Sequence, residues 1–366
     1  MKNQMLRIAL LVLSGCVGTL GASSSFAATD MPASHSVLLN KQELADLGAR
    51  RAAFSDLLSH CDRQLDYVAH PVAVLALAQH YTAKGVNTGS NTGKELTRDA
   101  RAAYRGGLCF LLTHDQRYAA STQRILDAWA GTLKKVTTLQ SKDNINFYVP
   151  YMIIAASWVH GAGHWNSTTF DRFLRTTVLP ASNSANPNNH GAWGVFLEAS
   201  IATYLGDTQL LERARHRWGT LLDGAVAADG TLTREIDRSA TSNYHGGPDK
   251  GVKGLAYTHY FMLPATMAAK IFADDGRPVW ATPEGKLFGR AFARAANWTL
   301  HPQTFPYYAS NGGKLEGVRT AAYFVLLLPH YPNADAEAVL KQGDIKADAF
   351  YLLDLFGAGD AHPGRH

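Results

Sequence analysis

The sequence lacks the short motifs by which many metal-dependent enzymes are identified. It contains no Asp-x-Asp-x-Asp-Gly calcium loop and no His-Glu-x-x-His zinc motif. His160 and His164 have the spacing of two ligands on one helix face, but the Gly-Ala-Gly between them favours a loop. We therefore expect no metal ion and no cofactor.

Long apolar runs are also scarce. Beyond the N-terminal region, no stretch is apolar and long enough to span a membrane. The N-terminal run, residues 8–20, follows Lys2 and Arg7, and the small-x-small pattern of a cleavage site comes after it. These features predict a signal peptide over residues 1–27, a single domain over residues 28–366, and a periplasmic or secreted protein.

Cysteine is rare, with three residues in a chain of 366. Cys16 ends a Leu-Ser-Gly-Cys stretch that resembles a bacterial lipobox, which would make the mature protein a lipoprotein. Because apolar residues continue past Cys16, we favour plain secretion. Cys61 and Cys109 are then the remaining thiols, and an oxidising compartment would allow them to pair. Two buried free cysteines are the alternative.

Strand signals and internal repeats are few. The best strand candidate is residues 231–236, and no 34- or 40-residue period supports an α-solenoid. Apolar residues instead recur at helical spacing. The expected helices cover residues 41–66, 70–81, 96–112, 118–129, 147–159, 168–177, 191–205, 208–225, 257–271, 285–300, 318–330 and 347–355. Because they come in pairs joined by short turns, we predict an all-α fold, an α/α toroid of antiparallel helical hairpins with a cleft where long loops gather.

The clearest candidate site is residues 188–193, Asn-Asn-His-Gly-Ala-Trp. A loop rich in Ser, Asn and Pro precedes it and a helical apolar pattern follows, so His190 is predicted at a helix N-terminus. The free N–H groups and asparagine amides there favour an anionic ligand, and a histidine in that place suits a general base or a hydrogen-bond donor. The alternative is an asparagine-rich cap followed by a core histidine.

A second long loop covers residues 239–254 and is rich in glycine. It carries Tyr244, His245, Lys250 and Lys253. A long loop in a compact helical domain is usually functional or disordered. We predict that this one is a lid.

Three stretches, in the same order and with similar gaps, resemble motifs of the helical alginate lyases, the mannuronate lyases of polysaccharide lyase family 5. Residues 188–193 resemble that family's Asn-Asn-His-x-x-Trp. Residues 229–238 resemble its aspartate-glycine, short extended segment and Glu-x-x-Arg, and residues 255–260 resemble its Leu-x-Tyr-x-x-Tyr helix. The resemblance spans roughly residues 95–275.

The resemblance implies an exported polysaccharide lyase that cleaves a polyuronate, mannuronate-rich alginate first, by β-elimination to give unsaturated uronate ends. Asn189, His190 and Arg238 would neutralise the substrate carboxylate, and Tyr257 would protonate the leaving oxygen O4. If the C5 proton and O4 share a face, as in mannuronate, Tyr257 can move both protons. If they lie on opposite faces, His190 is the natural base. In the family the arginine and tyrosine are about two helical turns apart, whereas here the glycine-rich loop separates them.

Further residues are predicted to contact the polymer, either beside these motifs or as an aromatic and amide strip. They are Asn146, Tyr148, Asn188, Trp193, Tyr244, His245, Lys253 and Tyr260. The alternative for residues 144–148 is a helix start with core aromatics. Tyr244 is also a rival for the proton transfer, but a helix holds a catalytic group more rigidly than a loop does, which favours Tyr257.

Other functions stay open at this point. The formal net charge of +5 fits an anionic polysaccharide partner, but many proteins with neutral ligands are as basic. Glucuronan is the second polymer, and we expect a monomer with no nucleic-acid partner. A glycoside hydrolase would need two carboxylates flanking one bond, which neighbours such as Glu235 and Asp237 serve poorly. A non-catalytic polysaccharide-binding protein is the remaining alternative.

Overall fold

The structure is a computed structural model that describes residues 36–82, 85–86, 93–240 and 246–357. The chain divides into two units, Met1–Met31 and Pro32–His366, and every described residue belongs to the second. The predicted signal peptide and Cys16 lie outside the described residues. Within the described part, no helix has the length and apolar character of a membrane span.

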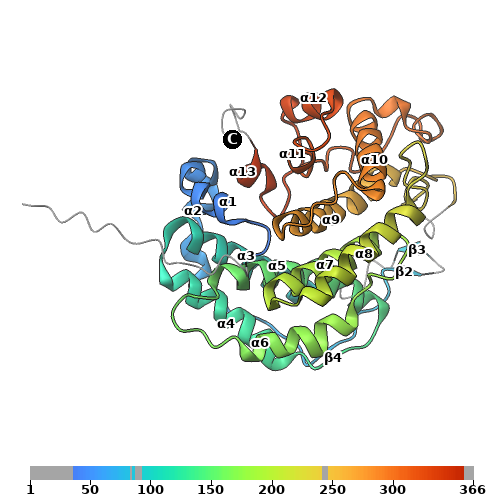
Figure 1. Ribbon diagram of the computed structural model, residues 1–366. Helices are drawn as coiled ribbons and strands as arrows, with labels where there is room; N and C mark the ends of the chain where they lie inside the picture. The colour runs from blue at the N-terminus through green and yellow to red at the C-terminus, as the bar shows by residue number, and fades with distance from the viewer. Residues whose placement is uncertain (1–35, 83–84, 87–92, 241–245, 358–366) are drawn as a thin grey trace, which may run out of the picture. The chain divides into compact units, whose positions relative to one another are not determined.

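Helices dominate the second unit (Figure 1). The long ones are α3 (Lys94–Thr113), α4 (Gln116–Thr132), α5 (Leu139–Val159), α7 (Asn189–Leu205), α8 (Thr208–Ala225), α9 (Gly254–Asp274) and α10 (Pro283–Leu300). The short ones are α1 (Lys41–Asp46), α2 (Ser55–Ser59), α6 (Thr168–Phe173), α11 (Phe324–Leu327), α12 (Ala334–Gln342) and α13 (Leu352–Phe356). Among the described residues, β1 (Val74–Leu75) pairs in parallel with β4 (Lys135–Val136), and β2 (Tyr81–Thr82) pairs antiparallel with β3 (Gly85–Val86).

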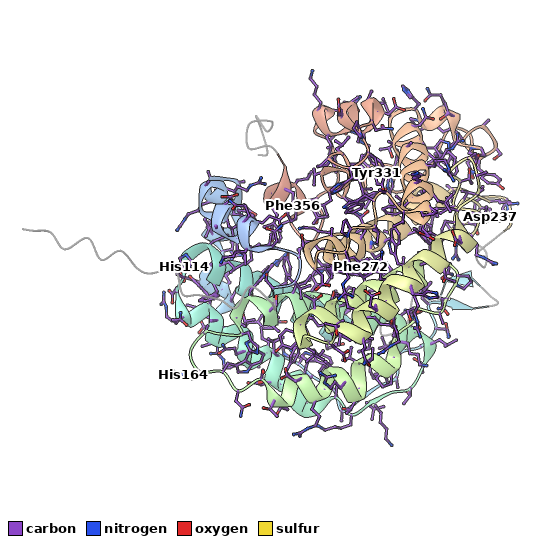
Figure 2. The ribbon with its side chains drawn as sticks, viewed as in Figure 1. His114, His164, Asp237, Phe272, Tyr331 and Phe356 are labelled. Atoms are coloured by element: carbon purple, nitrogen blue, oxygen red, sulfur yellow. A yellow bond between two sulfur atoms is a disulfide. The ribbon has the colours of Figure 1, made fainter. Side chains whose placement is uncertain are left out.

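The long helices form two layers. The inner layer is α3, α5, α7 and α9, in which α5 packs against α3 and α7, and α7 packs against α9. Outside them, α4 contacts α3 and α5, and α8 contacts α7 and α9, with side chains filling the space between the layers (Figure 2). This arrangement is an α/α toroid, so the predicted fold class is confirmed.

The inner helices all begin at the same end of the toroid. An outer helix returns the chain between one inner helix and the next, which makes the inner helices parallel. Contacts between α3 and α5 show it: Gly93 abuts Asn144 where both helices start, and Gly107 abuts Ala155 further along. The N-termini of α3, α5, α7 and α9 therefore gather at one end.

Helix α7 is buried more completely than its sequence predicts. The apolar spacing indicates one buried face, but most residues of α7 are buried on every side. The reason is that α5, α8 and α9 all pack against it. Such a helix cannot shift without disturbing the core, so its first turn is held rigidly.

Two segments near the N-terminus differ from prediction. Residues 41–66 form α1, α2 and 3₁₀ turns rather than one helix. The helix predicted over residues 70–81 is wrong, because this stretch contains β1, whose partner β4 lies about 60 residues away in the sequence. A distant strand partner leaves no mark on local periodicity.

Three further segments were also predicted longer or more regular than they are. In residues 231–236 the predicted strand reduces to one bridge between Val226 and Leu232. Of the helix predicted over residues 318–330 only α11 forms, and of the helix predicted over residues 347–355 only α13 forms, from Leu352 on. These are short apolar runs, for which periodicity does not separate helix, strand and buried coil.

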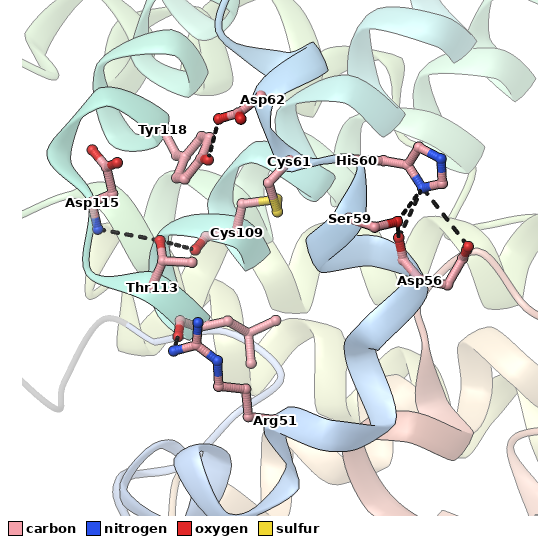
Figure 3. The surroundings of a disulfide bond; sticks show 11 residues. Arg51, Asp56, Ser59, His60, Cys61, Asp62, Cys109, Thr113, Asp115 and Tyr118 are labelled. Atoms are coloured by element: carbon pink, nitrogen blue, oxygen red, sulfur yellow. Dashed lines mark hydrogen bonds and ion pairs between the residues drawn. A yellow bond between two sulfur atoms is a disulfide. The ribbon is translucent and has the colours of Figure 1, made fainter.

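A disulfide joins Cys61, in the 3₁₀ turn Cys61–Gln64, to Cys109 of α3, with their Cα atoms 5.8 Å apart (Figure 3). Nearby, the Tyr118 hydroxyl donates to Asp62 at 2.8 Å. The disulfide decides between the two alternatives for these cysteines. It ties the N-terminal segment to the inner layer.

His259 is a core histidine. Its Nδ1 lies 3.1 Å from the Tyr323 hydroxyl, and its Nε2 lies 3.1 Å from the Val318 carbonyl and 3.3 Å from the Thr299 hydroxyl. Burial lowers the pKa of His259 from 6.5 to about 4. The helix therefore turns His259 into the core and leaves Tyr260, at 42% exposure, on the outside.

This histidine predicts acid-sensitive folding. Unfolded His259 takes up a proton near pH 6.5, whereas the folded side chain does so near pH 4, so its effect on stability is constant above pH 6.5 and unfavourable as pH falls from 6.5 to 4. Through His259 alone the free energy of unfolding should fall by about 3 kcal/mol across that window, at about 1.4 kcal/mol per pKa unit. Buried Asp348, whose pKa is raised to about 6, contributes a change of the opposite sign, so the effect of His259 is read by comparison with a variant. Denaturant unfolding at several pH values would measure it. His259→Gln should remove the His259 contribution, so its stability should fall less between pH 6.5 and 4 than that of the wild type, and equal slopes in both proteins would contradict the assignment.

Candidate active site

The first turn of α7 carries the Asn-Asn-His stretch, as predicted. Asn188 is the N-cap, and its side-chain oxygen accepts from the His190 backbone N–H at 3.2 Å. The preceding loop presses against this turn so closely that side chains at Gly191 and Gly194 would collide with the backbone of Asn186 and Ser184. The two glycines thus allow the loop to fix the direction in which α7 begins.

A buried carboxylate organises the next layer. Glu235 accepts from the Asn189 backbone N–H at 2.7 Å, and both its oxygens lie within 3.2 Å of the Asn189 side-chain amide nitrogen. The Arg238 Nε donates to the same carboxylate at 3.2 Å. All three residues are at most 3% exposed. Burial raises the pKa of Glu235, and the charge of Arg238 and the hydrogen bonds from Asn189 oppose that rise.

Arg238 connects this carboxylate to Tyr257. Its guanidinium carbon lies 4.8 Å from the centre of the Tyr257 ring, at a cation–π distance. The Tyr257 ring is partly exposed and lies edge-on to Tyr260, with the ring centres 5.5 Å apart. Asn189, Glu235, Arg238 and Tyr257 therefore form one continuous chain of contacts from α7 to α9.

The glycine-rich loop does not separate Arg238 from Tyr257 in space. The Lys253 backbone N–H donates to the Arg238 carbonyl at 3.0 Å, so the chain leaves and returns at the same place. Gly254 opens α9 against the Ile236 carbonyl, where any side chain would collide. Because the chain returns to Arg238 at Lys253, helix α9, which carries Tyr257, begins beside the arginine.

Asp143, in the first turns of α5, holds His190. Its Oδ1 lies 2.8 Å from His190 Nδ1 and accepts from the Asn183 amide at 2.7 Å. The His190 and Asp143 side chains are 15% and 18% exposed, and the His190 ring packs 5.6 Å from the Phe147 ring. Sequence reasoning missed Asp143. The available signal was its position on the same helix as Asn146 and Tyr148, which were chosen.

The site lies where the inner helices begin. Asp143 belongs to the start of α5, His190 to the start of α7 and Tyr257 to the start of α9. Helix N-termini present unpaired N–H groups and the positive end of the helix dipole. Several of them at one end favour a ligand that carries negative charge.

The residues predicted to bind the polymer divide into accessible and buried ones. Tyr148 is partly exposed, Tyr260 is exposed, and Lys253 is partly exposed with its ammonium 3.7 Å from Glu316. Asn188 is partly exposed but serves as the α7 cap. Tyr244 and His245 lie outside the described residues.

Two predicted contact residues are structural instead. Asn146 is fully buried, and its amide donates to the carbonyls of Lys142 and Ala181 at 2.7 and 2.8 Å. Trp193 is 9% exposed and packs 5.5 Å from the Phe147 ring. Asn146 is predicted from the amide and aromatic strip and Trp193 from the Asn-Asn-His-x-x-Trp motif. The inner layer uses both to hold α5, α7 and the intervening loop together.

The burial of Arg238 also corrects the sequence-based expectation. A direct, forked contact with a substrate carboxylate needs an open guanidinium edge, whereas Arg238 is 2% exposed beneath Tyr257. Its guanidinium instead lies against the Tyr257 ring, in a buried place where charges are weakly screened. Of the four residues predicted to be catalytic, His190 and Tyr257 are the partly exposed ones, and Asn189 and Arg238 are buried.

The hydrolase alternative finds no support in this geometry. Glu235 is 1% exposed and its oxygens are engaged by Asn189 and Arg238, so it cannot reach a glycosidic bond. Within the described ranges, no group of three or more His, Cys, Asp or Glu side chains is placed to hold a metal ion.

Comparisons with known proteins show which folds and which family the chain resembles. Among curated proteins, no sequence matches the chain. An alginate lyase structure from Bacteroides ovatus is similar with a TM-score of 0.66 and 15% identity, covering 89% of this chain and 99% of that one. A tyrosine-to-phenylalanine variant of alginate lyase A1-III complexed with a tetrasaccharide gives 0.63 and 17%, covering 88% and 97%. Alginate lyase A1-III from Sphingomonas species A1 gives 0.56 and 16%, also covering 88% and 97%.

These structural similarities, at low identity, establish the toroid fold. The family itself is shown by sequence. The profile of the family described as alginate lyase matches residues 61–305, about two thirds of the chain, and includes every residue of the contact chain described above. The protein belongs to the alginate lyase family and is a polysaccharide lyase.

Proposed function

We propose that the protein is an exported alginate lyase that cleaves mannuronate-rich polymer by β-elimination. The observation that carries the proposal is the contact chain from Asn189 through Glu235 and Arg238 to Tyr257. It places a partly exposed phenol directly above a buried positive charge, at the end of the toroid where helix N-termini gather. The tetrasaccharide bound to a related alginate lyase supports an oligosaccharide ligand here.

The chemistry requires that negative charge be stabilised. Removing the C5 proton beside a carboxylate puts extra charge on that carboxylate. The helix N-termini and the Arg238 guanidinium carry positive charge in fixed positions, so they stabilise this negative charge as it grows. In mannuronate the C5 proton and O4 lie on one face, so Tyr257 can accept the first as a phenolate and deliver a proton to the second. Arg238 beneath the ring stabilises the phenolate form.

Export is part of the proposal. The N-terminal sequence has the pattern of a signal peptide. The Cys61–Cys109 disulfide supports an oxidising compartment, because disulfides persist there and are rare in the cytosol. A periplasmic or secreted protein meets both observations.

The experiment is a polymer panel read by the ultraviolet absorbance of unsaturated uronate ends. Polymannuronate, polyguluronate and glucuronan would be offered to the purified mature protein, and we expect the highest kcat/KM on polymannuronate. New reducing ends without absorbance would indicate a hydrolase. Binding without any product would indicate a non-catalytic protein. Either result would end the proposal.

A further inference from the structure

A cavity of about 460 Å³ lies between α3, α2 and the C-terminal segment that leads into α13. Its volume is in the range of small-ligand sites, about 300–1,000 Å³. Among the described residues, its lining includes none from the contact chain between Asn189 and Tyr257. Its residues Arg101 and Arg105 lie about 10 and 16 Å along α3 from the helix start, where the candidate active site lies. The cavity is therefore separate from that site.

Three basic side chains line this cavity, and none of them is paired within the described part of the chain. Arg101 and Arg105 come from α3 and Lys346 from the segment before α13, and all three are exposed. No hydrogen bond or ion pair with a described residue engages these side chains. Unpaired cations around one cavity favour an anionic ligand. Two guanidinium groups favour a carboxylate, which an arginine can bind through two parallel hydrogen bonds.

The same cavity carries acidic groups, which narrow the choice of anion. Asp56 of α2 is exposed, and the Asp348 carboxylate accepts from the backbone N–H groups of Phe350 at 2.9 Å and Leu352 at 3.1 Å. Burial raises the pKa of Asp348 to about 6, so at pH 7 this group is mostly ionised and accepts hydrogen bonds. A bare anion would be repelled by these carboxylates. A sugar acid presents a carboxylate to the arginines and hydroxyl donors to the carboxylates.

Tyr351 forms an aromatic part of the wall in a strained conformation. Its φ of 56° lies in the left-handed region, which residues other than glycine rarely adopt. The neighbouring Phe350 is anchored, since its ring stacks 4.0 Å from that of Tyr151 and its carbonyl accepts from the Tyr104 hydroxyl at 2.7 Å. Strain of this kind persists only where the surroundings fix it, and it is common at ligand sites. The partly exposed Tyr351 ring gives the cavity an apolar face for a sugar ring.

We propose that this cavity is a second binding site for uronate oligosaccharides, in which Arg101 and Arg105 hold a sugar carboxylate and the acidic groups accept from sugar hydroxyls. The choice of ligand rests on the lyase function proposed above, whereas the site itself rests on the cavity and its unpaired cations. A second site keeps the polymer attached between successive cleavages. It therefore lowers KM on long polymer without changing the chemical step.

The first experiment counts binding sites. A mannuronate trisaccharide is titrated calorimetrically into the mature protein carrying Tyr257→Phe, in which cleavage is expected to be slow. We expect two trisaccharides per protein. Adding Arg101→Gln and Arg105→Gln should weaken one site at least about tenfold, the effect of losing one charged hydrogen bond, and leave the other site unchanged. Because both arginines are exposed and unpaired among the described residues, thermal unfolding should not shift.

The second experiment measures kcat and KM on polymannuronate in the otherwise wild-type protein. Arg101→Gln with Arg105→Gln should raise KM about tenfold and leave kcat within about twofold. Arg172→Gln with Arg290→Gln is the matched control, because it removes two exposed arginines of α6 and α10 that lie outside the cavity. The control loses the same net charge, but both binding sites should remain and KM should stay within about twofold.

The outcomes separate this inference from the function on which its ligand rests. Fewer than two trisaccharides per protein, or two undiminished sites without Arg101 and Arg105, overturns the second site and leaves the lyase proposal standing. Displacement of the second trisaccharide by an equal concentration of inorganic phosphate, or an equal rise of KM in the control pair, overturns it as well. Two bound trisaccharides without any unsaturated product from the wild type overturns the lyase proposal and leaves the second site standing.

Discussion

Replacing Tyr257 with phenylalanine is expected to lower turnover on polymannuronate by about 10³-fold or more, because one hydroxyl serves as acid and base there. The ring stays in place over Arg238 and against Tyr260, so the packing of the α9 start should be unchanged. KM should move little. Absorbance assays for kcat and KM, with thermal unfolding to verify folding, would measure the effect.

Tyr260→Phe is the matched control. It is the same substitution three residues along the same helix, at an exposed position whose ring touches Tyr257. It should lower kcat less than tenfold. Tyr244, in the loop, is the rival for the proton transfer, and Tyr244→Phe should mainly raise KM. An inactive Tyr244→Phe beside an active Tyr257→Phe would show that the loop supplies the catalytic hydroxyl.

Local sequence was sufficient for the start of α7 but not for every helix start at the site, since α5 begins at Leu139, eight residues before the predicted start, and α9 begins at Gly254, three residues before it. Asn188 was predicted as a cap and does cap α7, because capping depends on one side chain and the two or three residues after it. Which groups meet across helices was a different matter. Neither Asp143 with His190 nor Glu235 with Asn189 could be read from spacing, since each pair is more than 40 residues apart.

Burial was the property that sequence reasoning misjudged most. Asn146, Trp193 and Arg238 are residue types that often touch sugars or carboxylates, and all three are buried here. In a toroid the inner helices are enclosed on several sides, so polar residues within them serve packing and alignment. Composition cannot show this, because it depends on how many neighbours a helix acquires. The result is a site with an accessible pair, His190 and Tyr257, above a buried support.

The buried Arg238 beneath Tyr257 is the basis of the second prediction with a large effect on activity. Arg238→Lys is expected to lower kcat/KM on polymannuronate about 100-fold although the charge is kept. The guanidinium Nε donates to Glu235 at 3.2 Å, and the guanidinium carbon lies 4.8 Å from the centre of the Tyr257 ring. An ammonium is a compact, strongly hydrated charge on a flexible stem and cannot fill both places. Tyr257 then loses its fixed position, so the fall should be in kcat rather than KM.

The choice of lysine makes the Arg238 experiment interpretable. Removing the charge would leave Glu235 buried without its counter-ion, which typically costs about 3–5 kcal/mol and would confuse lost folding with lost catalysis. Lysine keeps a cation near Glu235, so thermal unfolding should shift only modestly. Arg277→Lys, at an exposed pair with Glu212 and Asp275, is the control for the substitution itself and should retain full activity. If Arg238→Lys retained it as well, charge alone would account for the role of Arg238, and the alignment of Tyr257 would have to come from Tyr260 and the α9 backbone.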